Sequence, residues 1–114
     1  MNGNSESRPL GWIKFWKPKD DWYGLNAEAR KNYYDKYKEL VDRIEGKGAI
    51  LIGTYRCRGQ SRWERFEFWE FPSIDLLIAF SNELESINHY LYFEENAKVG
   101  RKYKRLYNPN TWVT

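Results

Sequence analysis

Hydrophobic and polar residues alternate with a period of two in several stretches of the chain, and this alternation predicts strands. The first three predicted strands cover residues 10–18, 49–59 and 61–71. The loop G-Q-S-R joins the second strand to the third and predicts a hairpin. We expect a fourth strand near residues 90–96, where the run of aromatic residues favours a strand and the following E-E-N-A-K would also suit a helix.

Two segments between these strands have helical spacing. The first predicted helix begins at the N-cap Asn26 and is terminated by Gly46 and Gly48, and the second begins after Pro72 with Ser73 as its cap. The core-facing positions expected on the first helix are Tyr33, Tyr37, Leu40, Val41 and Ile44. Those expected on the second helix are Ile74, Leu77, Ile78 and Leu84.

The order of these elements is β-α-β-β-α-β, which predicts the α+β ferredoxin-like fold with a four-stranded antiparallel sheet and both helices on one face. The 114 residues suffice for one domain, which we place at residues 10–98, between a flexible N-terminus at 1–9 and a basic C-terminal tail at 99–114. The net charge of +3 comes from this end of the chain, where residues 98–105 hold five basic side chains and no acidic one. The rest of the chain has no basic face, so a nucleic-acid partner is not expected.

Large side chains occupy both faces of the predicted sheet, in a chain that is 18% aromatic. The residues expected to face the helices are Ile13, Phe15, Phe66, Phe68, Leu91 and Phe93. Those expected on the opposite face are Trp12, Lys14, Trp16, Arg65, Glu67, Trp69, Tyr92 and Glu94, and the parity of the second strand around Tyr55 stays open. Two helices cover only one side of a four-stranded sheet, so the aromatic side chains on the other side need a second cover. This predicts a homodimer in which a second copy of the chain covers that face. Its mixture of rings and charges also predicts a cleft for a small planar apolar ligand.

The sequence resembles one superfamily in its order of elements, in W-E-F-P-S before the second helix and in the late Y-x-Y-F-E-x-x-N. This is the dimeric α+β barrel superfamily, the ferredoxin-like group that contains the antibiotic-biosynthesis-type monooxygenases, and the resemblance is closest to its uncharacterised members. The resemblance covers residues 10–98. It implies a homodimer whose two sheets pack face to face, with a cleft between each sheet and its helices or within the barrel.

Candidate chemistry follows from this cleft. The candidate catalytic residues are His89, Glu67 and Glu94, and the candidate ligand-binding residues are Trp12, Trp16, Tyr55, Arg65, Trp69 and Tyr92. A binding protein, a cofactor-free monooxygenase-like enzyme and a dimer whose rings only fill the interface all remain open, so the sequence does not decide whether the protein is an enzyme.

The superfamily also has a haem-degrading branch, for which Trp69 and His89 would match the tryptophan and histidine, but the first strand offers no asparagine. No cofactor is therefore expected. One histidine and one cysteine are too few for a typical structural zinc site, so no metal is expected either.

The single cysteine, Cys57, excludes an intrachain disulfide and favours a reducing compartment. No signal peptide is expected at the start of the sequence, and no segment approaches the ~18 uninterrupted apolar residues of a membrane span. We therefore expect a cytoplasmic protein that does not enter a membrane.

Overall fold

The computed structural model describes residues 9–59 and 61–102. The predictions for residues 1–8 and for residues 103–114 of the tail lie outside this part of the chain. The elements in chain order are β1 (Leu10–Pro18), α1 (Asp20–Tyr23), α2 (Ala27–Gly46), β2 (Ile50–Arg56), β3 (Arg65–Phe71), α3 (Ile74–Ser86), α4 (His89–Tyr92) and β4 (Phe93–Arg101).

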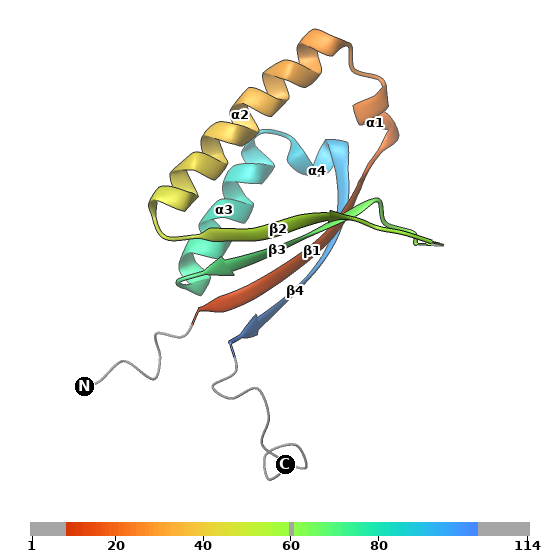
Figure 1. Ribbon diagram of the computed structural model, residues 1–114. Helices are drawn as coiled ribbons and strands as arrows, with labels where there is room; N and C mark the ends of the chain where they lie inside the picture. Colours follow the sequence, from red (N-terminus) through yellow and green to blue (C-terminus); the bar gives the residue numbers. More distant parts are fainter. Residues whose placement is uncertain (1–8, 60, 103–114) are drawn as a thin grey trace, which may run out of the picture.

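The four strands form one antiparallel sheet in the order β2-β3-β1-β4. Figure 1 shows α2 and α3 lying on the same side of this sheet. The predicted α+β fold with the order β-α-β-β-α-β is thus confirmed. The short helices α1 and α4 were not predicted, and residues 89–92, which we expected partly in the fourth strand, form a helical turn before it. β4 stays paired with β1 as far as Arg101, so the fourth strand continues past its predicted end near residue 96.

Helix α2 begins and ends where the sequence predicts. The Asn26 side chain accepts a hydrogen bond from the backbone N–H of Ala29 at 2.8 Å, which satisfies a donor that the helix itself leaves unpaired. The helix ends at Gly46, and the chain turns away through Gly48, whose φ of 108° favours glycine. Its core-facing residues are the expected ones, with Tyr33, Leu40 and Ile44 buried and Tyr37 and Val41 packed beside them.

Helix α3 has the expected cap, since Ser73 accepts from the backbone N–H of Leu76 at 3.2 Å. Its predicted stripe is partly wrong. Leu77 and Leu84 are buried, but Ile74 and Ile78 are about half exposed, and Phe80 takes a fully buried place instead. Residues 77, 80 and 84 follow steps of three and four and so lie on one line along the helix, beside which residues 74 and 78 are rotated outward.

The predicted orientation of the strand faces is wrong for most positions. The strand residues that are buried on the side of the helices are Leu10, Trp12, Lys14, Glu67, Trp69 and Phe71. Ile13, Phe15, Phe66 and Phe68 share the other parity of the paired strands and lie on the open face. Phe93 does pack toward the helices, as predicted, whereas Leu91 and Tyr92 belong to α4, where Leu91 is exposed.

The strand faces were assigned wrongly because of charge: a face that carries lysine and glutamate is normally the less buried one. Lys14 and Glu67 are tolerated inside because they lie near each other, with Glu95 close by as a second carboxylate. Two tryptophans of this face, Trp12 and Trp69, then pack around Phe80 of α3.

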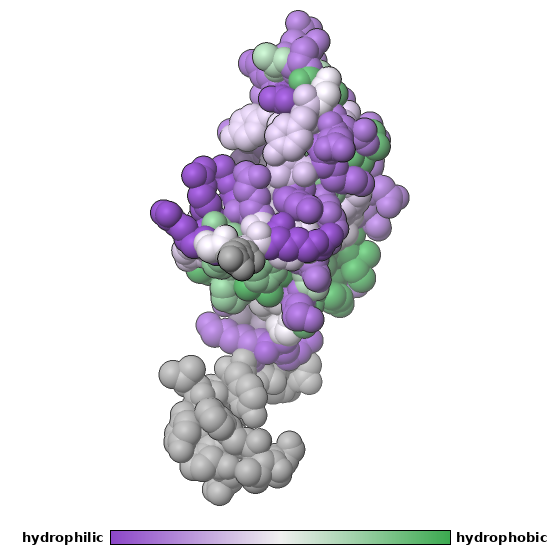
Figure 2. Space-filling view, turned by 90° about the vertical axis from the view of Figure 1, so that its right-hand side faces the viewer, coloured by the Kyte–Doolittle hydropathy of each residue, from purple (hydrophilic) through white to green (hydrophobic). Residues whose placement is uncertain are grey.

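The open face of the sheet is aromatic. Phe66 contacts both Phe15, at 5.4 Å between ring centroids, and Tyr55, at 4.9 Å. Phe68 and Tyr55 are 40% and 48% exposed. Figure 2 looks onto the end of the β2–β3 hairpin and shows hydrophobic side chains gathered on the lower half of the described residues. No helix within residues 9–59 and 61–102 is both long and apolar enough to span a membrane.

Candidate ligand cavity

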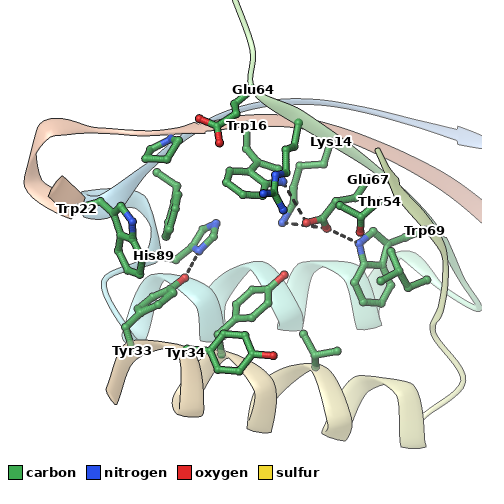
Figure 3. A pocket seen from close by; sticks show the side chains of 16 residues that line it. Lys14, Trp16, Trp22, Tyr33, Tyr34, Thr54, Glu64, Glu67, Trp69 and His89 are labelled. Carbon is green, nitrogen blue, oxygen red and sulfur yellow. Dashed lines mark hydrogen bonds and ion pairs between the residues drawn. The ribbon is translucent and has the colours of Figure 1, made fainter. Parts of the chain in front are cut away.

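A cavity of about 590 Å³ lies between the sheet and helix α2. Its walls are mainly rings, contributed by Trp16, Trp22, Tyr33, Tyr37, Trp69 and Phe93. Charged side chains come from the strands β1 and β3 and from Glu64 just before β3, and His89 comes from α4 (Figure 3). The cavity therefore combines an apolar wall with a few convergent polar groups, which is the usual make-up of a small-molecule site.

The period of two in the strands and the helical period in α2 place these rings together. Lys14 and Trp16 are two positions apart on β1 and share the face toward the helices, opposite Glu67 and Arg65 of β3. Tyr33 and Tyr37 are one turn apart on α2 and stack with centroids 6.1 Å apart. The cavity is therefore lined by elements that come from most of the length of the described chain.

Glu67 fixes two of the walls. Its carboxylate accepts hydrogen bonds from the indole N–H of Trp16 at 3.1 Å and of Trp69 at 2.8 Å. The side chain is only 8% exposed, so these bonds are made largely out of water. Glu67 thus sets the orientation of the two tryptophans that a ligand would meet.

Lys14 is a buried cation, with 1% of its side chain exposed. Its Nζ lies 3.2 Å from Oε2 of Glu95 and 3.8 Å from Oε1 of Glu67. Nζ also lies 5.0 Å from the centroid of the Trp12 ring. These contacts are electrostatic, because Nζ makes no hydrogen bond of good geometry within the described chain.

His89 links a tyrosine to a carboxylate. Its Nδ1 is hydrogen-bonded to the hydroxyl of Tyr33 and its Nε2 to Oε2 of Glu95. Burial raises the pKa of Tyr33, and the neighbouring Tyr37 and Glu95 raise it further, so Tyr33 keeps its proton. Because the ionised carboxylate of Glu95 can only accept, the Nε2–H of His89 donates to it, and the Nδ1 of a neutral ring then accepts from the Tyr33 hydroxyl. Burial opposes ionisation of Glu95, but the hydrogen bond from His89 and the charge of Lys14 outweigh it and hold the pKa of Glu95 below its ordinary value.

Five predicted site residues line the cavity, namely Trp16, Arg65, Glu67, Trp69 and His89. The other four lie elsewhere. Trp12 belongs to the core behind the cavity, and Tyr55 lies on the open face of the sheet against Phe66. Tyr92 packs on Trp22 and Tyr33 without lining the cavity. Glu94 points to the surface, where it pairs with Arg62 and Lys17.

Lys14, Tyr33, Glu67, His89 and Glu95 form one polar cluster at the cavity. Three of its residues, Lys14, Tyr33 and Glu95, were absent from the predicted site. The position of Lys14 could have been predicted from its neighbours. It lies between Trp12 and Trp16 on the same side of the strand, so its side chain must run along an aromatic surface. Tyr33 was read as a core position on α2. Glu95 stood next to Glu94, and only the start of β4 at Phe93 decides which of the two points inward.

His89 does not fit the role of a haem ligand, because both of its ring nitrogens are already hydrogen-bonded. Within residues 9–59 and 61–102, no group of three or more His, Cys, Asp or Glu side chains is arranged to hold a metal ion. The cluster instead offers proton donors and acceptors.

Residues 11–106 match the model of the "Family of unknown function (DUF6616)". The chain belongs to this family. The matched residues include all those that line the cavity, which lie between Lys14 and Phe93.

Solved structures support the fold. Chlorite dismutase from Candidatus Nitrospira defluvii in complex with imidazole is similar with a TM-score of 0.74 and 19% identity, over 90% of this chain and 43% of that chain. A variant of that chlorite dismutase in complex with cyanide gives a TM-score of 0.74 and 18% identity, over 96% of this chain and 48% of that chain. The chain therefore shares the ferredoxin-like α+β fold of these structures, and it spans less than half of each neighbour.

A pyruvate dehydrogenase (NADP+) from Cryptosporidium parvum is 29% identical over 93 residues, which are 78% of this chain and 4% of that protein. This chain therefore corresponds to a small part of that relative. Its activity as a whole does not transfer to a domain of this size.

Proposed function

We propose that this protein binds a small, planar, largely apolar molecule in the cavity between its sheet and α2. The observation that supports this proposal best is a 590 Å³ cavity walled by rings whose two strand tryptophans are held by one buried carboxylate. Flat apolar ligands stack on such rings, and a wall that is already ordered loses little entropy on binding.

We propose further that a second copy of the chain covers the open face of the sheet. Phe15, Phe66 and Tyr55 form a contiguous aromatic surface there that no helix of the described chain covers. Exposed apolar patches of this kind on a sheet are typical of interfaces. The ligand cavity lies on the opposite side of the sheet, so the two roles do not compete for the same residues.

A cofactor-free monooxygenase-like activity is the second candidate, and the Tyr33–His89–Glu95 chain supports it. A hydroxyl of the ligand would give its proton to the Tyr33 oxygen while the Tyr33 proton moves to Nδ1 of His89, and Glu95 would stabilise the resulting imidazolium. His89→Ala should then abolish any oxygen uptake in the presence of 1-naphthol and leave naphthalene-type ligands bound. Loss of a Soret band from haem-titrated protein in the same variant would favour haem binding through His89 instead.

The binding proposal is tested by isothermal titration calorimetry with 2-acetonaphthone as the probe. Val41 lines the cavity, and its neighbour Asp42 is exposed on the same helix. Val41→Trp should fill the cavity and remove saturable binding, and Asp42→Trp should bind like the wild type. Equal loss or equal retention of binding in both variants would contradict the cavity as the site.

A further inference from the structure

Two buried nitrogen atoms at the cavity lack a hydrogen-bond partner. Among the buried side-chain nitrogen and oxygen atoms of residues 9–59 and 61–102, Nζ of Lys14 and Nε of Arg65 have none. Both residues line the cavity. In Figure 3 the Lys14 side chain reaches from its strand toward the middle of the cavity, next to Glu67. Both donors therefore belong to the same ring-walled space.

Unpaired donors at such depth are costly, since a buried polar group without a partner loses its hydration and gains nothing in return. A lysine ammonium carries three N–H donors, and the two carboxylates beside Lys14 neutralise its charge without accepting a well-formed hydrogen bond. The ammonium group is therefore held in place while its N–H donors lack a hydrogen-bond acceptor. A ligand oxygen in the cavity is the natural acceptor for it.

The charges around the cavity indicate that this acceptor is uncharged. Two cations, Lys14 and Arg65, are balanced by the two buried carboxylates Glu67 and Glu95, so this part of the cavity is neutral when His89 is neutral. Glu64 adds a further negative charge among the exposed lining residues. An anionic ligand would meet a site without net positive charge, whereas a carbonyl oxygen accepts from Lys14 without disturbing the balance.

We infer that the ligand is an aromatic carbonyl compound, a flat ring system whose C=O oxygen accepts a hydrogen bond from Nζ of Lys14. Arg65, which lies opposite Trp16 on the adjacent strand and has its guanidinium 5.7 Å from that ring, supplies a second donor on the same wall. This inference rests on the proposed ligand-binding function. It adds the position and the chemical class of the polar group.

Three naphthalenes of similar size test the inference on the wild-type protein by calorimetry. They are 2-methylnaphthalene, which has no acceptor, 2-acetonaphthone, which has a neutral carbonyl, and 2-naphthoate, which is anionic. A hydrogen bond to a charged donor predicts that 2-acetonaphthone binds on the order of ten- to a hundredfold more tightly than 2-methylnaphthalene. It should also bind more tightly than 2-naphthoate, and the infrared stretch of its carbon-13-labelled carbonyl should shift to lower frequency on binding.

A matched pair of double variants locates the donor. Lys14→Met with Glu95→Gln removes the buried pair without leaving a lone charge, and Lys17→Met with Glu94→Gln removes the half-exposed pair of the same two strands. The first should erase the preference for the ketone and the carbonyl shift, and the second should keep both. If the first variant does not fold, the order of the affinities of the three ligands for the wild type and the shift of the carbonyl stretch still test the inference.

The outcomes separate the inference from the proposal beneath it. If none of the three compounds binds saturably, the proposed binding function fails. If all bind but 2-methylnaphthalene binds as tightly as 2-acetonaphthone, the binding function stands and the carbonyl inference is overturned. Tightest binding of 2-naphthoate would overturn the argument from charge.

Discussion

Glu67 connects three side chains of the cavity, because its two oxygens accept from Trp16 and Trp69 while Lys14 lies 3.8 Å away. Glu67→Gln keeps the shape but leaves one oxygen to accept from both indoles and removes the charge that faces Lys14. We expect a loss of about 1–3 kcal/mol in the free energy of unfolding, measured by urea denaturation. Glu94→Gln is the control on the surface, and its unfolding midpoint should not change. Equal effects of the two substitutions would contradict the assigned role of Glu67.

Tyr33 and Tyr37 make stability depend on alkaline pH. Burial raises the pKa of both phenols well above their ordinary value of 10.0. Above that pH the unfolded chain releases these protons and the folded chain keeps them, so stability that is fully present below it falls as pH rises. The loss per phenol approaches about 1.4 kcal/mol per pH unit once the phenol of the unfolded chain is fully ionised.

Urea denaturation of the wild type and of Tyr33→Phe between about pH 10 and pH 11 measures this slope. Over this range Tyr33→Phe should lose less stability than the wild type by about 1 kcal/mol, because the unfolded phenol is only half ionised at pH 10. Parallel slopes for the two proteins would show that Tyr33 titrates in the folded chain as it does when unfolded.

Local signals could be predicted from the sequence, and long-range partners could not. The caps Asn26 and Ser73 act within three residues, so the pattern around them sufficed. The link from Lys14 through Glu95 to His89 joins β1 to β4 and α4, and no local pattern indicates such a pairing. For this reason the sequence placed only Trp16, Arg65, Glu67, Trp69 and His89 of its candidates at the cavity, and the buried Lys14 and its partner Glu95 were not among the predicted residues.

At the scale of the strand, parity decides which ring is core and which is surface. Both parities of β3 carry large rings, so hydrophobicity alone did not determine the face, and a shift by one residue exchanges all of them. The structure places Trp69 at 1% exposure and its neighbour Phe68 at 40%. Two adjacent residues of one strand therefore have opposite environments.

The same substitution at these two positions tests the assignment. Trp69→Asp puts an unpaired charge among packed rings and should cost several kcal/mol, enough to unfold the chain, as measured by far-ultraviolet circular dichroism. Phe68→Asp should retain the wild-type spectrum of the folded protein. A folded Trp69→Asp variant would show that the helix-covered face is assigned to the wrong parity.

For the whole molecule, the arrangement is a sheet with a cavity on the helix side and an uncovered aromatic surface on the other. If a second copy covers that surface, multi-angle light scattering at micromolar concentration should give twice the chain mass of 13.8 kDa for the wild type. Phe68→Asp should give the mass of one chain, since it places a charge in the interface. A wild-type monomer would contradict the proposed dimer and leave the ligand cavity unaffected.

The central claim is that a ligand binds between the sheet and α2, and both faces of the sheet are aromatic enough to attract a flat molecule. Intermolecular nuclear Overhauser effects between bound 2-acetonaphthone and assigned aromatic protons distinguish the two faces directly. The account predicts contacts from the ligand to Trp16, Tyr33 and Trp69, which line the cavity. Contacts to Tyr55, Phe66 and Phe68 instead would place the ligand on the open face and contradict the account.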